Sequence, residues 1–248
     1  MIDPVAINFG PVKIHWYGII MAFGFLIAYF VSQKLAKYRN ISKKDISDYF
    51  TYFVISAILG ARIFAVILNY KIYLSNPWEI FAVWHGGMAI HGGIIGVFLA
   101  TYYFAKKRNI KFYDLLDIMV IPTALGLSMG RIGNFINQEF YGRPTLLPWG
   151  VYFDNLQEKR HPSQIYESIK NLIIFSITLK LFLFKKLKSG TIFWAFILLY
   201  SVLRFSVEFF KDMPTFLNLT YGQIISIPLA ITSIYFLKKI GKPLNNNK

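Results

Sequence analysis

The sequence predicts an all-α polytopic membrane protein with about seven transmembrane helices. Of its 248 residues, 55% are hydrophobic, and the mean hydropathy is +0.46, so the chain is more apolar than a soluble domain of this size. Several apolar runs approach the length of about 20 residues that crosses the hydrocarbon core of a bilayer. A transmembrane β-barrel is not expected, because barrel strands give short alternating segments instead of long apolar runs.

Seven apolar segments account for the predicted helices. They lie at 17–36, 47–69, 88–105, 114–136, 166–184, 191–210 and 222–240. The sequence shows no internal repeat, so we expect residues 1–248 to form a single transmembrane helical domain. The long connection at 137–165 is expected to be a loop segment on the outer side of the membrane.

The basic residues predict how these helices are oriented. Lysine and arginine are concentrated in alternate connections, at 37–46, 106–113, 185–190 and in the C-terminal tail, and are sparse in the others. Because basic connections stay in the cytoplasm, the N-terminus is expected outside and the C-terminus inside. The formal net charge of +15 then faces anionic lipid, so no nucleic-acid partner is expected.

Five of the predicted helices carry polar side chains in their outer halves, near the outer leaflet. These side chains are Tyr17, Arg62, His91, Arg131 and Arg204. Ionisable groups inside membrane spans usually face a cavity and mark function. Convergence of five helices at one depth therefore predicts a site near the outer leaflet.

An anionic ligand explains these arginines better than local pairing does. The alternative is that each arginine pairs with an acid and only holds helices together, but few acids lie on the outer side: Glu139, Glu167 and Glu208. The excess of positive charge predicts a phospholipid headgroup. Arginine is suited to bidentate phosphate contacts. Two lysines inside the fifth segment, Lys170 and Lys180, lie within reach of span ends, where they can snorkel.

Helical spacing groups the polar residues further. Tyr200, Arg204 and Glu208 are four residues apart and so share one face of the sixth segment. Arg131 and Asn134 are three apart on the fourth. Gly130 and Gly133 leave room for a close approach, either by lipid or by a packed helix.

Four further motifs contain residue types that could take part in catalysis. His91, in HGGIIG, has a side chain suited to proton transfer near neutrality, whereas His85, in WHGGM, is expected in a turn before that helix. HPSQIYE, at 161–167, is expected to begin the fifth helix, with Ser163 as a possible cap. GLSMG, at 126–130, matches the serine-hydrolase elbow but lies inside a helical run, so a serine protease is not expected. No metal-ligand motif is present.

Taken together, these residues resemble the prolipoprotein diacylglyceryl transferase family of bacterial membrane enzymes. GRIGNFINQEFYG, at 130–142, matches the family signature at every defining position. The resemblance extends over nearly the whole chain, through HWYG at 15–18, GARI at 60–63, WHGGMAIHGG at 84–93, HPSQIYE at 161–167 and RFSVEFF at 204–210. The short outer segment between the fourth and fifth helices is a departure, since some relatives carry a larger domain there.

The resemblance implies an activity and a role for each site residue. A diacylglyceryl group would pass from phosphatidylglycerol to the lipobox cysteine thiol of a prolipoprotein, releasing glycerol phosphate at the outer leaflet of the bacterial cytoplasmic membrane. Its partners would be these two substrates and membrane lipids, and no metal or other cofactor is expected. The resemblance implies that Arg131 and Arg204 hold the phosphate, that Asn134, Tyr17 and Tyr200 supply hydrogen bonds, and that His91 is the general base. Glu139 and Glu208 would orient the arginines, and Arg62 could either hold the phosphate or orient other side chains.

Three other functions remain as alternatives. A transporter would carry polar residues through the full depth of the bundle, yet the inner halves are apolar, as in FLIAYFV at 25–31. A CDP-alcohol phosphotransferase needs an aspartate-rich metal motif, and Asp114 and Asp117 lack the partners that it requires. A lipid-binding protein without catalysis would keep the arginines, and substitution of His91 would distinguish it from an enzyme.

Overall fold

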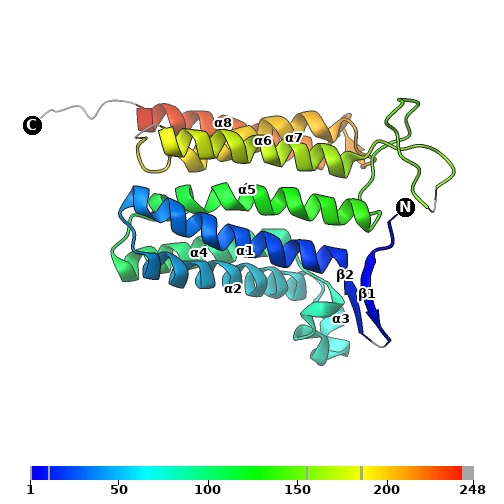
Figure 1. Cartoon of the computed structure of the whole chain (residues 1–248), viewed down its shortest axis with the longest axis horizontal. Coiled ribbons are helices and arrows are strands. Elements are labelled where there is room, and N and C mark those ends of the chain that lie inside the picture. The colour runs from blue at the N-terminus through cyan, green and yellow to red at the C-terminus, as the bar shows by residue number, and fades with distance from the viewer. Residues whose placement is uncertain (1, 11, 155, 185–186, 242–248) are drawn as a thin grey trace, which may run out of the picture. The chain divides into compact units, whose positions relative to one another are not determined.

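A computed structural model describes residues 2–10, 12–154, 156–184 and 187–241, and most of these residues are helical (Figure 1). In chain order the elements are β1 (Val5–Phe9), β2 (Val12–His15), α1 (Trp16–Ala36), η1 (Lys37–Arg39), α2 (Lys43–Leu68), α3 (Tyr70–Ser75), η2 (Pro77–Ile80), η3 (Val83–His85), α4 (Ile90–Arg108), α5 (Phe112–Ile136), α6 (Ser163–Phe184), α7 (Thr191–Glu208), β3 (Thr215–Phe216), β4 (Leu219–Thr220) and α8 (Tyr221–Gly241).

Each predicted apolar segment corresponds to one long helix: α1, α2, α4, α5, α6, α7 and α8. Within the described ranges, five of them are long and apolar enough to cross a membrane, namely α1, α2, α5, α7 and α8. The chain is therefore a multi-pass membrane protein. The sequence of α6 is interrupted by Glu167, Lys170 and Lys180, and the last turn of α4 is basic.

The chain divides into two compact units, which are described separately. The larger unit comprises Met1–Val31 and Asp117–Lys248, and the smaller unit comprises Ser32–Leu116. Each contains its own packed helices.

In the smaller unit, α2 packs closely against α4. A Cβ atom added to Gly60 would overlap the carbonyl of Gly92, and one added to Gly96 would overlap the carbonyl of Ser56. Small residues let the backbones of membrane helices approach in this way. Farther along the same pair, the buried hydroxyls of Tyr49 and Thr101 form a hydrogen bond of 2.7 Å.

In the larger unit, α6, α7 and α8 lie side by side (Figure 1). The carboxylate of Asp117, on α5, accepts hydrogen bonds from the backbone N–H groups of Gly190 and Phe193, at 2.9 and 2.8 Å. These N–H groups begin α7 and have no partner within the helix. Asp117 therefore caps α7 and has a structural role.

The segment between α5 and α6 is tied to the end of α7. The backbone N–H of Gly142 donates to the carbonyl of His161 at 2.8 Å, and that of Arg143 donates to the carbonyl of Phe210 at 3.0 Å. Gly142 sits where a Cβ atom would overlap the Phe210 carbonyl. These bonds hold Gly142 and Arg143 beside His161 and Phe210.

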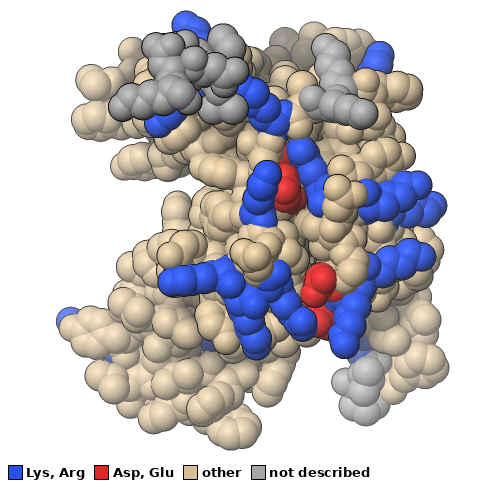
Figure 2. Space-filling model, turned by 90° about the vertical axis from the view of Figure 1, so that its left-hand side faces the viewer, with Lys and Arg blue, Asp and Glu red and all other residues tan. Residues whose placement is uncertain are grey.

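Basic residues gather at helix ends in each unit. The smaller unit has Lys37 and Arg39 in η1 and a basic last turn of α4, and the larger unit has Lys238 and Lys239 in the last turn of α8. Figure 2 shows a face on which lysine and arginine are abundant and acidic residues are few. Lys185, Lys186 and Lys242 also belong to the predicted basic connections and lie outside the described residues.

Candidate active site

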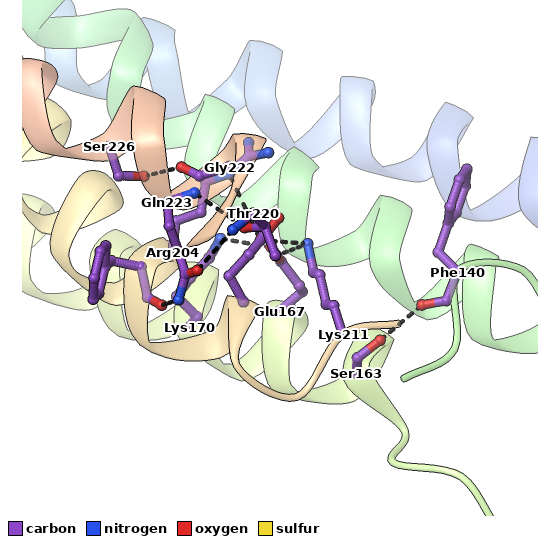
Figure 3. A network of polar contacts seen from close by, with 12 residues as sticks. Phe140, Ser163, Glu167, Lys170, Arg204, Lys211, Thr220, Gly222, Gln223 and Ser226 are labelled. Carbon is purple, nitrogen blue, oxygen red and sulfur yellow. Dashed lines mark hydrogen bonds and ion pairs between the residues drawn. The ribbon is translucent and has the colours of Figure 1, made fainter. Parts of the chain in front are cut away.

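The centre of the candidate site is the buried carboxylate of Glu167, in the first turns of α6 (Figure 3). Its Oε2 lies 2.5 Å from Nζ of Lys170, and its Oε1 lies 2.6 Å from Nζ of Lys211. Lys211 also lies 3.2 Å from the carboxylate of Glu208, at the end of α7. Two carboxylates and two lysines thus form a compact network that is almost closed to solvent.

Helix α7 contributes an arginine at the edge of this network. The side chain of Arg204 is 36% exposed, whereas that of Glu208 is 4% exposed. Nε of Arg204 is 3.9 Å from the Glu208 carboxylate, and Nη1 donates to the hydroxyl of Tyr200 at 3.3 Å. Gly222 of α8 packs on Glu208 so closely that a Cβ atom would overlap the carboxylate. The predicted Tyr200–Arg204–Glu208 face is therefore present.

Helix α5 contributes the second arginine. Nε of Arg131 lies 3.9 Å from Oε2 of Glu167, and its side chain is 29% exposed. Asn134 lies 3.5 Å from the same guanidinium and donates to the carboxylate of Glu139 at 3.1 Å. The signature segment thus brings Arg131, Asn134 and Glu139 together and joins them to the Glu167 network.

Tyr17 reaches the same helix from the start of α1. Its ring lies against Gly133, one turn before Asn137, and about one-third of the tyrosine remains exposed. Gly133 is thus needed for the close approach of an aromatic side chain. Gly133 was expected to allow a close approach by lipid or by a packed helix, and in the structure the group that packs on it is the ring of Tyr17.

The charges of this site favour an anion. Around Glu139, Glu167 and Glu208 lie four cationic side chains: Arg131, Lys170, Arg204 and Lys211. The lysines are buried against carboxylates, while the arginines keep longer contacts and partial exposure. Arginine N–H groups arranged in this way suit a planar, bidentate partner such as a phosphate.

In the smaller unit, Arg62 is committed to backbone carbonyls. Its guanidinium donates to the carbonyls of Glu79, Ile80, Ala82, Gly86 and Gly87. It also lies over the ring of Tyr73, and the residue is 5% exposed. Arg62 was expected either to hold the phosphate or to orient other side chains. These contacts favour the second role, but the group that Arg62 holds in place is the loop before α4 and not another arginine.

The two candidate histidines also lie in the smaller unit. His91 is exposed in the first turn of α4, next to Gly92 and Gly93. His85 ends η3, and its Nδ1 lies 3.0 Å from the carboxylate of Glu79. Gly86 and Gly87 follow it with φ of +86° and +67°, which confirms the turn expected at WHGGM.

Some expectations from the sequence are corrected. Lys170 does not snorkel, since it is 3% exposed and paired with Glu167. The hydroxyl of Ser163 donates to the carbonyl of Phe140 at 2.7 Å, which ties the outer segment to α6.

The rival catalytic motifs are occupied by structural contacts. The hydroxyl of Ser128, in GLSMG, is buried and donates to the carbonyl of Ser168, 2.9 Å away. Asp114 lies 3.6 Å from Arg39, and Asp117 caps α7. Among the residues that the structure describes, no group of three His, Cys, Asp or Glu could hold a metal ion.

Sequence reasoning gave too small a role to Glu167 and left out Lys211. The sequence places Glu167 only among the few acids on the outer side, and it predicts no role for Lys211. The spacing Glu208–Lys211, three residues apart, was the signal for the second. Lys170 lies three residues after Glu167 on α6, but no local pattern links Lys211 to this pair, because Lys211 follows α7 and is far away in sequence.

Apolar helices around a buried ion-pair network, with two part-exposed arginines at its edge, define a membrane protein with a charged cluster between its helices. Comparison with known proteins identifies its family. The protein-family model described as "Prolipoprotein diacylglyceryl transferase" matches residues 4–238. The chain therefore belongs to the prolipoprotein diacylglyceryl transferase family and is a transferase, and the resemblance predicted from GRIGNFINQEFYG is confirmed.

Similar proteins of three bacteria carry one name, phosphatidylglycerol–prolipoprotein diacylglyceryl transferase. The protein of Geobacter sulfurreducens is 38% identical over 242 residues, which cover 94% of this chain and 93% of the relative. That of Nitratidesulfovibrio vulgaris is 38% identical over 251 residues, covering 97% and 95%. That of Finegoldia magna is 38% identical over 243 residues, covering 98% and 97%.

Proposed function

We propose that the protein transfers the diacylglyceryl group of phosphatidylglycerol to the thiol of the lipobox cysteine in a prolipoprotein, the first step of lipoprotein maturation. Family membership supports the reaction. The observation that carries the site is the pair Arg131 and Arg204, whose side chains are partly exposed beside the buried Glu167 network.

The reaction takes place at the carbon of the diacylglyceryl group that carries the phosphate oxygen. The thiol sulfur forms a C–S bond to this carbon, the C–O bond to the phosphate breaks, and glycerol phosphate leaves with the electron pair. The phosphate gains negative charge as it leaves. Arg131 and Arg204 can stabilise that charge, because preorganised donors act most strongly where charge develops.

The remaining site residues have supporting roles. Asn134, Tyr17 and Tyr200 offer hydrogen bonds to the headgroup, and Glu139 and Glu208 orient the side chains beside them: Glu139 through Asn134, and Glu208 through its 3.9 Å contact with Arg204. His91 is the proposed base that takes the thiol proton, because imidazole titrates near neutrality. Arg62 holds the loop that leads to His91.

The membrane arrangement completes the proposal. All seven long helices span the bacterial cytoplasmic membrane as one domain, with the N-terminus outside and the C-terminus in the cytoplasm. The basic last turns of α4 and α8 support this orientation by the positive-inside rule. The site then opens toward the outer leaflet, and the segment 137–165 forms a lid or a platform for the incoming peptide.

A transfer assay with the purified protein in detergent tests the proposal. The substrates are phosphatidylglycerol and a peptide with a lipobox cysteine, and the readout is a mass gain of one diacylglyceryl group on the peptide. We expect the gain with the wild type and its loss in Arg131→Ala and Arg204→Ala. A mass gain that persists in both variants would show that Arg131 and Arg204 do not form the phosphate site. No mass gain with folded wild-type protein would favour a lipid-binding protein or a transporter.

The assignment of the base has its own comparison. His91→Asn should lower kcat by about 10²–10⁴-fold, the range for loss of a general base, and should leave lipid binding intact. His85→Asn is the matched control, because His85 lies in the same loop region but pairs with Glu79. Equal activity of the two variants would exclude His91 as the base.

A further inference from the structure

Lys170 is a buried lysine to which the proposed reaction gives no role. It is 3% exposed, inside α6, and its Nζ lies 2.5 Å from Oε2 of Glu167 and 4.3 Å from the centre of the Tyr200 ring. Burial of an ammonium group is costly unless it is paired. Lys170 is therefore fixed between the central carboxylate and the aromatic ring beside Arg204 (Figure 3).

The contacts of Glu167 divide its cationic neighbours into two layers. Each carboxylate oxygen has a lysine within 2.6 Å, Lys170 on one and Lys211 on the other. Arg131 approaches the same carboxylate only to 3.9 Å. An arginine engaged with a carboxylate as a bidentate pair would lie at about 2.7–2.9 Å. The lysines thus occupy the positions that would otherwise attract the guanidinium.

We propose that Lys170 is a positioning residue that saturates Glu167 and so keeps the Arg131 guanidinium directed toward the phosphate of the lipid substrate. The inference rests on the proposed function, because it concerns how the same arginine binds that phosphate. Lys211 has the matching role on the other oxygen of Glu167 and also on Glu208.

Removal of Lys170 leaves a buried carboxylate oxygen without its donor. Such an atom recruits the nearest cation, because an unpaired buried charge is strongly destabilising. Arg131 already faces that oxygen, with its Nε 3.9 Å from Oε2, whereas Lys211 is engaged by Oε1 and by Glu208. Arg131 would turn toward Glu167 and lose contacts to the phosphate. The defect should therefore appear in lipid affinity more than in the chemical step.

The test measures KM for phosphatidylglycerol and kcat in the transfer assay. Lys170→Met should raise KM by at least about tenfold, the effect of losing one charged hydrogen bond to the lipid. The double variant Glu167→Gln with Lys170→Met also removes the negative charge that would draw Arg131 away from the phosphate, so its KM should be lower than that of Lys170→Met. Lys180→Met, on the exposed side of the same helix, is the control and should match the wild type.

Each outcome separates the inference from the function on which it rests. A wild type without transfer overturns the proposed function, and the inference with it. An active wild type with an unchanged KM in Lys170→Met overturns the inference alone, as does a double variant no better than the single one. Where Lys170→Met does not fold, Lys170→Gln keeps an N–H donor for Glu167 without the charge, and a KM equal to that of the wild type in this variant would overturn the inference.

Discussion

The ring of Tyr17 lies directly on Gly133, so that a Cβ atom added to the glycine would lie 2.5 Å from Cδ2 of the tyrosine. Carbon atoms at normal contact are about 3.5–4.0 Å apart. Gly133 is one position before Asn134, within the segment that carries Arg131. The absence of a side chain at residue 133 thus sets where Tyr17 stands beside two proposed substrate-binding residues.

Gly133→Ala should displace Tyr17 and lower kcat/KM for the transfer reaction. A displacement of about 1 Å near a reacting centre can cost up to about 100-fold. Gly126→Ala is the matched control on the same helix, because nothing lies within 4 Å of a Cβ atom there. Both variants should keep the helical content of the wild type by circular dichroism. Equal kcat/KM in the two variants would show that Tyr17 does not need this position.

The helices were predictable because their apolar runs are long. Each predicted segment begins and ends within a few residues of a helix in the structure, as with 114–136 and α5, Phe112–Ile136. The short elements were not predicted, because β1, β2 and α3 have five, four and six residues, too few for an apolar period to show. Long-range order in these segments depends on tertiary contacts, such as the carbonyls around Arg62.

The candidate site was predictable where its residues share a helix. Arg131 with Asn134, and Tyr200 with Arg204 and Glu208, follow from spacing alone. The pairs Glu167–Lys211 and Asp117–Gly190 join residues that are far apart in sequence, so no periodicity indicates them. The prediction that Lys170 snorkels was wrong. A lysine near a span end usually extends its ammonium group to the interface, but Glu167, three residues away on the same helix, is a buried partner for Lys170.

Arg62 should be required for the order of the loop before α4. In Arg62→Ala the five carbonyls lose a common donor, at a cost of about 1–3 kcal/mol for each one left unsatisfied. Arg62→Lys should recover only part of this order, because a lysine lacks the planar fork of donors. Hydrogen exchange of residues 79–87 should therefore become faster in both variants, and more so in Arg62→Ala.

A control for this prediction lies in α3 of the same unit. Lys71→Ala removes an exposed basic side chain and should leave exchange at residues 79–87 unchanged. Wild-type exchange rates in Arg62→Ala would mean that the loop is held by other contacts, and would return Arg62 to the group of candidate phosphate ligands.

His161 joins the outer segment to α6 through the hydroxyl of Tyr166. The hydroxyl of Tyr166 accepts a hydrogen bond from Nε1 of Trp149 at 2.8 Å, so its own proton is available for Nδ1 of His161, 3.0 Å away. The imidazole also meets the ring of Phe210 edge-on, with centroids 5.1 Å apart. Burial, and then the charge of Arg143, lower the pKa of His161 from its usual 6.5. Both effects disfavour the protonated ring.

Protonation of His161 should therefore destabilise the folded protein at acidic pH. Because its pKa is lower in the folded state than in the unfolded state, the unfolded state binds more protons as the pH falls. The stabilisation is complete above pH 6.5 and is lost as the pH falls through 6.5 toward the lower folded-state pKa. Between pH 7.5 and 5.5, the Tm of the wild type should fall more than that of His161→Gln, which cannot titrate. Exposed His15 is the control, and His15→Gln should follow the wild type. Parallel Tm profiles for the wild type and His161→Gln would mean that the ring is protonated without cost, and that Tyr166 does not donate to it.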